Sequence, residues 1–126
     1  MTLTDAEWNV MEALWERSPA TVRDVMDRLG ARTGWAYTTV KTILERMAAK
    51  GALRRRRRDR VGWFEPLVSR RTARRSAVRS LLDRAFDGAV GSLLQHLVSE
   101  ERISPRDRRR LAALIDEENR KDGGKK

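Results

Sequence analysis

One stretch, residues 37–60, constrains the fold of this chain more than any other. In its first half, apolar side chains recur at positions i, i+3, i+4 and i+7: Val40, Ile43, Leu44 and Met47. This spacing is typical of one buried face of an α-helix. Gly51 is a residue type that commonly ends a helix, and five consecutive arginines, Arg54 to Arg58, follow it. The stretch therefore predicts a helix followed by a densely cationic segment.

The exposed face of this predicted helix is slim and polar. At 100° per residue, small or polar side chains lie opposite the apolar stripe: Thr38, Lys41, Thr42, Glu45 and Ala49. A slim polar face beside a cationic segment suits the major groove of DNA. An ordinary solvated face would be the default for an isolated helix, but the adjoining arginines favour DNA. The DNA-contacting residues predicted on the helix are Tyr37, Thr38, Thr39, Lys41, Thr42 and Arg46.

The expected roles of these residues follow from their chemistry. Threonine hydroxyls donate or accept hydrogen bonds, and Lys41 suits guanine or phosphate. Tyr37 either contacts phosphate or closes the entrance to the helix, and Arg46 is expected to reach the DNA backbone. About half of the arginines beyond Gly51 should face DNA, because side chains of a strand alternate between two faces. Contacts to phosphate or the minor groove, which set affinity more than sequence preference, are predicted for Arg54, Arg55, Arg56, Arg57, Arg58 and Arg60.

The distribution of charge supports a polyanionic partner. The 126 residues carry a net charge of +10. Residues 1–51 hold equal numbers of basic and acidic side chains, whereas residues 52–79 hold eleven arginines against two carboxylates. An excess concentrated in one segment is typical of a surface that binds a polyanion.

Two further helices are predicted before this stretch. Thr4 and Glu7 form a capping box at the start of a helix over residues 5–17, whose apolar face holds Trp8, Met11, Leu14 and Trp15. Thr21 caps a second helix with an apolar stripe at Val22, Val25, Met26 and Leu29, and we expect Gly30 to end it. Residues 31–36 are expected to form a loop. The second and third helices then form a helix-turn-helix pair.

A hairpin is predicted after the third helix. Residues 52–58 and 62–67 flank a short connection at residues 59–61, and Trp63 and Phe64 favour strands. Pro66 lies near the end of the second strand, where the backbone N–H that proline lacks is not needed for pairing. Residues 1–68 are therefore predicted to form a winged helix-turn-helix DNA-binding domain, with three helices and a two-stranded wing.

The remainder of the chain is predicted to be helical, which makes the protein mainly α. Apolar positions indicate helices over residues 70–87, 89–99 and from Pro105, and residues 122–126 are expected to be disordered. Three short helices cannot enclose a core, so we expect residues 69–121 to form a helical dimerisation domain that pairs with a second copy. The predicted dimerisation residues are Val78, Leu81, Leu82, Phe86, Leu93, Leu94, Leu97, Leu111, Leu114 and Ile115.

The chain resembles the BlaI/MecI penicillinase repressor family over nearly its whole length. The segments that carry the resemblance are MTLTDAEWNVMEALWE, TVRDVMDRL, AYTTVKTILERMAAKGALRRR and FEPLVS. The resemblance implies a dimeric winged-helix repressor that binds an inverted-repeat operator in double-stranded DNA. It also implies a membrane-bound sensor metalloprotease as a partner, whose cleavage in the C-terminal region relieves repression. The family's cleaved asparagine–phenylalanine bond corresponds here to His96–Leu97, which is a departure from that pattern.

Other function classes lack a basis in the sequence. The chain has no cysteine and a single histidine, His96, so no thiolate metal site, copper-sensing cysteine pair or catalytic constellation is expected, and neither is a cofactor. No leader or membrane-spanning run is evident, so we expect a cytoplasmic protein that does not insert into membranes. The alternative to a sequence-specific repressor is a non-specific basic protein associated with DNA or RNA.

Overall fold

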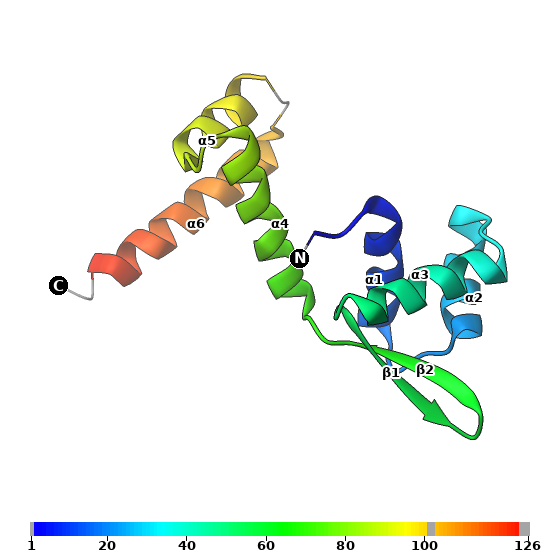
Figure 1. Cartoon of the computed structure of the whole chain (residues 1–126). Coiled ribbons are helices and arrows are strands. Elements are labelled where there is room, and N and C mark those ends of the chain that lie inside the picture. Colours follow the sequence, from blue (N-terminus) through cyan, green and yellow to red (C-terminus); the bar gives the residue numbers. More distant parts are fainter. Residues whose placement is uncertain (1, 101–102, 124–126) are drawn as a thin grey trace. The chain divides into compact units, whose positions relative to one another are not determined.

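The computed structural model describes residues 2–100 and 103–123, and its chain divides into two compact units, Met1–Ser80 and Leu81–Lys126. The first unit contains three helices, a hairpin and the start of a fourth helix (Figure 1). The elements are α1 (Asp5–Glu16), α2 (Val22–Thr33), α3 (Tyr37–Ala49), β1 (Leu53–Arg58), β2 (Val61–Pro66), α4 (Arg70–Ala85), α5 (Val90–Ser99) and α6 (Pro105–Gly123). The predicted mainly helical class is confirmed.

The apolar stripes of α1, α2 and α3 meet in one core. The fully buried side chains of the three helices include Val10, Met11, Leu14, Val25, Leu29, Val40, Leu44 and Met47. Val10 is fully buried in the core, whereas Trp8 and Ile43 are only half-buried. Phe64 from β2 closes the core beneath the helices. The hairpin is thereby fixed to the helices that precede it.

Both predicted helix caps are present. The Thr4 hydroxyl accepts from the backbone N–H of Glu7, and the Glu7 carboxylate accepts from the N–H of Thr4. Thr21 and Asp24 make the same reciprocal pair at the start of α2. Each pair satisfies amide groups that the first helical turn leaves without partners.

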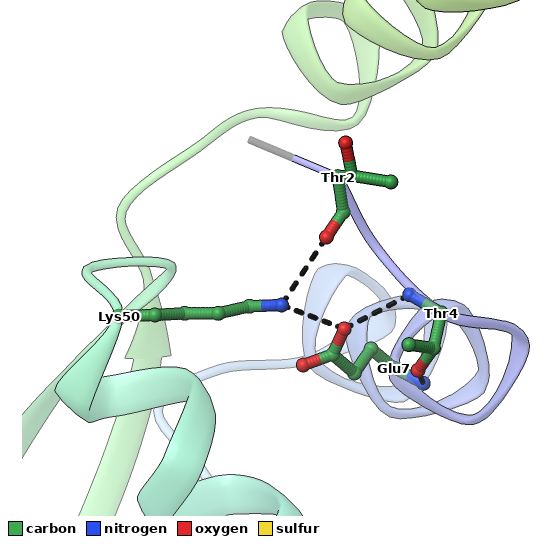
Figure 2. Close-up of polar contacts among 4 residues, drawn as sticks. All are labelled: Thr2, Thr4, Glu7 and Lys50. Atoms are coloured by element: carbon green, nitrogen blue, oxygen red, sulfur yellow. Dashed lines mark hydrogen bonds and ion pairs between the residues drawn. The ribbon is translucent and has the colours of Figure 1, made fainter.

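The cap of α1 also binds the end of α3. Figure 2 shows Lys50 reaching from the residue after α3 to the Glu7 carboxylate, with 2.7 Å between Nζ and Oε1, and to the carbonyl of Thr2 at 3.2 Å. Burial raises the pKa of Glu7, but the hydrogen bonds from Lys50 and Thr4 outweigh it and hold this pKa below its usual value. Glu7 therefore links the beginning of the first helix to the end of the third.

The predicted end of α2 at Gly30 is wrong. The helix continues through Gly30 to Thr33, and Gly34 ends it in the left-handed conformation, with φ of 65°. A glycine inside a helix costs only about 1 kcal/mol relative to alanine, so neighbouring turns and packing can carry the helix past it. Gly34 supplies the positive φ of a helix C-cap, and its N–H donates to the carbonyl of Gly30.

The hairpin is present with tighter boundaries than predicted. β1 and β2 pair antiparallel from Leu53 opposite Pro66 to Arg58 opposite Val61. The connection has two residues, Asp59 and Arg60, and not three, because Val61 already pairs. Both connecting residues have positive φ, which matches the twist of two-residue hairpin turns. The hairpin projects from the three helices as a wing (Figure 1).

One strand contact was not predicted. Ala20, between α1 and α2, exchanges two backbone hydrogen bonds with Phe64, at 2.9 and 2.8 Å. This bridge adds a one-residue third strand beside β2. It holds the start of α2 next to the wing.

The residues that follow the wing contact α1. The indole N–H of Trp15 donates to the carbonyl of Val68 at 2.9 Å, and the Arg70 guanidinium lies over the Trp15 ring, 5.5 Å from its centroid. Arg70 also pairs with Glu12 at 2.9 Å, and Arg74 approaches the same carboxylate at 4.0 Å. The first turns of α4 are therefore fixed to α1 in the first unit.

The second unit contains the end of α4, together with α5 and α6. At the end of α4 the N–H of Gly88 donates to the carbonyl of Leu82, and Gly88 has a φ of 78°. Phe86 lies in this turn rather than in the helix and meets His96 of α5 edge-on, with 6.1 Å between ring centroids. Helix α6 extends to Gly123 and so includes the first two residues of the predicted tail, while residues 124–126 lie outside the described part of the chain.

Candidate nucleic-acid interface

A groove runs between α3, the start of α2 and the wing. Its volume is about 380 Å³. It is lined by Thr21, Val22 and Arg23 of α2, by Tyr37, Lys41 and Glu45 of α3, and by Arg55, Arg57, Arg60, Val61, Gly62 and Phe64 of the hairpin. The Ala20–Phe64 bridge brings these elements together, because it joins the start of α2 to β2. The groove thus combines a polar helix face with a row of arginines.

The six residues predicted on α3 are all exposed, and two of them line the groove. Tyr37 and Lys41 are four residues apart and line the groove. The other four, Thr38, Thr39, Thr42 and Arg46, are exposed outside it, on the remainder of the free surface of α3. The buried stripe of Val40, Leu44 and Met47 holds the helix against the core, so its free face is fixed in orientation.

The wing arginines divide between two faces of the hairpin. Arg55 and Arg57 face the groove, because alternate residues of β1 share a face. Arg54 and Arg56 lie opposite the groove face and contact Glu65 of β2, at 3.7 and 2.9 Å. Alternate side chains of β1 therefore lie on the groove face and beside Glu65.

The remaining wing arginines extend the cationic surface. Arg60 lines the groove from the turn of the hairpin. Arg58 lines a second hollow of about 350 Å³ together with Pro19, Arg56, Arg57 and Trp63. The arginines of the wing thus surround its tip on both faces.

Cations dominate the groove. Arg23, Lys41, Arg55, Arg57 and Arg60 line it, and Glu45 carries the single carboxylate among its described lining residues. An oxygen of Glu45 lies 4.0 Å from a guanidinium nitrogen of Arg55, and both side chains are more than two-fifths exposed. Pairs of this kind contribute little to stability because water and salt screen them. Most of the positive potential of the groove is therefore open to a polyanion.

Three polar groove residues, Thr21, Arg23 and Glu45, were missing from the predicted site. Thr21 and Arg23 enter it through the Ala20–Phe64 bridge, for which the sequence holds no local signal. Glu45 does have a signal, since its four-residue spacing from Lys41 places both on one row of the helix.

Two arginines of α4 pair with a carboxylate of their own chain. Arg70 and Arg74 both contact Glu12 of α1. From the sequence alone, these side chains are as suited to acidic residues of a second copy as to phosphate. In the first unit this pair of arginines instead fixes the start of α4.

The predicted dimerisation residues are mostly exposed in the single chain. Leu82 is buried, with 6% of its surface exposed, and Phe86, Leu93 and Leu111 are half-buried. The exposed members of the set are Val78, Leu81, Leu94, Leu97, Leu114 and Ile115. His96 and Leu97, at the position of the family's cleaved bond, lie in the last turns of α5 and are exposed.

Two properties of the described residues bear on other functions. Among residues 2–100 and 103–123, histidine and carboxylate side chains do not gather in groups that could hold a metal ion. Within the same residues, each helix is too short or too polar to cross a membrane.

Known proteins resemble the chain along most of its length. A family model described as "Penicillinase repressor" matches residues 3–117. The Bacillus licheniformis penicillinase repressor is 27% identical over 120 residues, which cover 94% of both chains. The Mycobacterium tuberculosis transcriptional regulator BlaI is 38% identical over 116 residues, which cover 89% of this chain and 84% of the relative.

Solved structures resemble the first unit. A solution structure of the DNA-binding domain of the repressor BlaI matches with a TM-score of 0.50 and 30% identity, over 55% of this chain and 84% of that one. The monomeric form of Bacillus licheniformis BlaI in complex with the blaP half-operator matches equally well, over 56% of this chain and 85% of that one. The predicted winged helix-turn-helix is confirmed by these likenesses together with the helices and hairpin described above.

Proposed function

The chain belongs to the penicillinase repressor family and is a DNA-binding transcriptional repressor, and we propose that it acts in the cytoplasm as a dimer on an inverted-repeat operator in a promoter. Bound there, it would exclude RNA polymerase from the promoter. The groove between α3 and the wing carries the proposal, because it combines a polar helix face with five cationic side chains. We assign the protein no catalytic step.

The two parts of the interface have different tasks in this proposal. Helix α3 enters the major groove, where Lys41, Thr38 and Thr42 contact base edges. The wing arginines contact phosphate or the adjacent minor groove and supply most of the affinity. Support comes from the fixed orientation of α3 and from the wing's position beside it.

A dimer matches two half-sites, and the C-terminal helices are proposed to form it. Among the described residues, eight large apolar side chains of α4, α5 and α6 are exposed in the single chain, and six of them, including Leu94 and Leu114, belong to the predicted dimerisation set. A symmetric pairing of two copies would remove this surface from water. The dimer would then place two α3 helices about one turn of DNA apart.

Release from DNA is proposed to follow proteolysis in the C-terminal region by a membrane-bound sensor metalloprotease. His96 and Leu97 lie where the family's cleaved bond is expected, and both are exposed on α5. Cleavage in α5 would separate α6 from the DNA-binding unit. The loss of dimer contacts would lower the affinity for an operator with two half-sites.

A footprint on DNA tests the proposed function. A duplex selected by the protein from a random pool would be end-labelled and digested in its presence. A sequence-specific dimer protects two half-sites with fixed boundaries. Protection without boundaries, spreading as protein is added, would instead indicate a non-specific basic DNA-associated protein.

A further inference from the structure

We propose that Glu45 selects a base in the operator, by accepting a hydrogen bond from the exocyclic amino group of a cytosine in the major groove. The inference rests on the proposed entry of α3 into that groove. The other residues proposed to contact DNA carry hydrogen-bond donors or hydroxyl groups. Glu45 would add an acceptor that disfavours particular bases.

The position of Glu45 places it at the DNA-facing surface. Tyr37, Lys41 and Glu45 are spaced by four residues on α3 and line one side of the same groove. Eight residues of helix span about 12 Å, so the row extends over roughly two turns. A duplex that meets Lys41 on this row meets Glu45 one turn later.

In the free protein Glu45 lies among cations, and DNA that enters the groove competes with its carboxylate for them. Five cationic side chains line the groove with it, and an approaching phosphate backbone adds further negative charge. The contact with Arg55 spans 4.0 Å between exposed side chains, so it contributes little and can open when Arg55 turns to a phosphate. Glu45 must then find a donor on the DNA or be desolvated without one.

Base chemistry limits the choice of donor. An ionised carboxylate only accepts hydrogen bonds. In the major groove guanine presents two acceptors and thymine an acceptor and a methyl group, so both repel or fail to bind it. Adenine presents a donor beside an acceptor, whereas cytosine presents its amino donor alone. Glu45 therefore favours cytosine first and disfavours guanine and thymine.

Lys41, one helical turn earlier on α3, favours a base that presents hydrogen-bond acceptors. Its ammonium group donates only, and suits the two acceptors of guanine. Lys41 therefore favours a hydrogen-bond acceptor at one base pair of the operator, and Glu45 favours a donor at the next. This alternation selects sequence in a way that the arginines of the wing do not.

Selection from a random duplex pool tests the inference with the full chain. Wild type, Glu45→Gln and Glu45→Ala would each be selected and their preferred sequences compared. We expect one position in each wild-type half-site to favour cytosine about tenfold or more. Glu45→Gln should shift that position towards adenine, since glutamine pairs with the adenine edge, and Glu45→Ala should relax it. The other positions should not change.

Arg55→Ala is the matched control, because it removes the partner of Glu45 and leaves the carboxylate. It should weaken binding to all sequences and lower the salt dependence, while the cytosine preference remains. If Glu45→Gln alters affinity or salt dependence but no base preference, Glu45 merely positions Arg55 and the inference is wrong. If wild type selects no sequence at all, the proposed sequence-specific repressor fails as well, which is a distinguishable result.

Discussion

Single residues connect the parts of the DNA-binding unit. Glu7 satisfies the cap of α1 and accepts from Lys50 at the end of α3, so one carboxylate stabilises two helices. Asp24 has the matching role at the cap of α2, where the hydrogen bond from the Thr21 backbone lowers its pKa most. Both groups have a lowered pKa in the folded chain. Their contribution to stability is therefore present above the unfolded pKa and is lost as the pH falls through the folded one.

Glu7→Gln should make the protein less sensitive to acid. For wild type, the contribution of Glu7 is complete above its unfolded pKa of about 4.3 and is lost as the pH falls through its lower folded pKa. The variant is less stable at neutral pH because it loses the charge pairing with Lys50, but its free energy of unfolding should fall less between neutral pH and pH of about 3. Urea unfolding across this range measures the difference. Parallel curves for the two proteins would show that Glu7 titrates alike in the folded and unfolded states.

Arg57 and Arg56 are adjacent but should differ in their importance for DNA. Arg57 faces the groove, and among the described residues it has no ion-pair partner, whereas Arg56 lies 2.9 Å from Glu65. Arg57→Ala should weaken binding to every sequence and reduce the salt slope by about 0.9. Arg56→Ala should have a smaller effect, because Glu65 already offsets its charge. Binding titrations at several salt concentrations compare the two, and a larger effect of Arg56→Ala would reverse the assignment of the wing faces.

At the scale of helices and strands, patterns among residues close in the sequence predicted the structure, whereas contacts between distant residues could not be predicted. The two helix caps and the stripes of α1 and α3 were evident because each depends on residues close together in the sequence. The end of α2 was misplaced, since two glycines four residues apart, Gly30 and Gly34, both resemble a helix end. The groove depends on the Ala20–Phe64 bridge, which joins residues 44 positions apart and has no local pattern. Hence the exposed face of α3 was predictable, and the place of Arg23 in the groove was not.

The two glycines of α2 provide a matched pair of substitutions. In both cases an added Cβ would meet no atom within 4 Å, so packing does not distinguish them. Gly30→Ala should stabilise the protein by about 0.5–1 kcal/mol, because Gly30 lies inside the helix. Gly34→Ala should destabilise it by about 1 kcal/mol, because the φ of Gly34 is 65°. Thermal unfolding measures both, and a destabilising Gly30→Ala would indicate that the helix ends at Gly30 after all.

At the scale of the whole molecule, charge and apolar surface are separated along the chain. The excess positive charge lies between residues 52 and 79, while exposed apolar side chains recur on α4, α5 and α6. A dimer formed by the C-terminal helices would cover the apolar surface and leave the charged one for DNA. The sequence predicted this separation from composition alone, but it could not show that Leu82 is already buried within one chain.

Leu114→Asp should disrupt the proposed dimer. Leu114 is 47% exposed in the single chain, so a charge there leaves the fold intact but would be buried without a partner in a dimer. Sedimentation at micromolar concentration should show a dimer for wild type and a monomer for the variant. Leu67→Asp is a control, because Leu67 is similarly exposed, at 51%, but follows the wing. A monomeric wild type would contradict the proposed dimer.

The central claim is that α3 recognises the DNA sequence while the wing beside it supplies most of the affinity. Its most direct test is the ratio of the affinities for a selected operator and for random DNA at moderate salt. For wild type we expect the operator to bind at least about a thousandfold more tightly. Lys41→Ala combined with Thr42→Ala should lower this ratio mainly by weakening operator binding. Equal affinities of the wild-type protein for operator and random DNA would contradict the account.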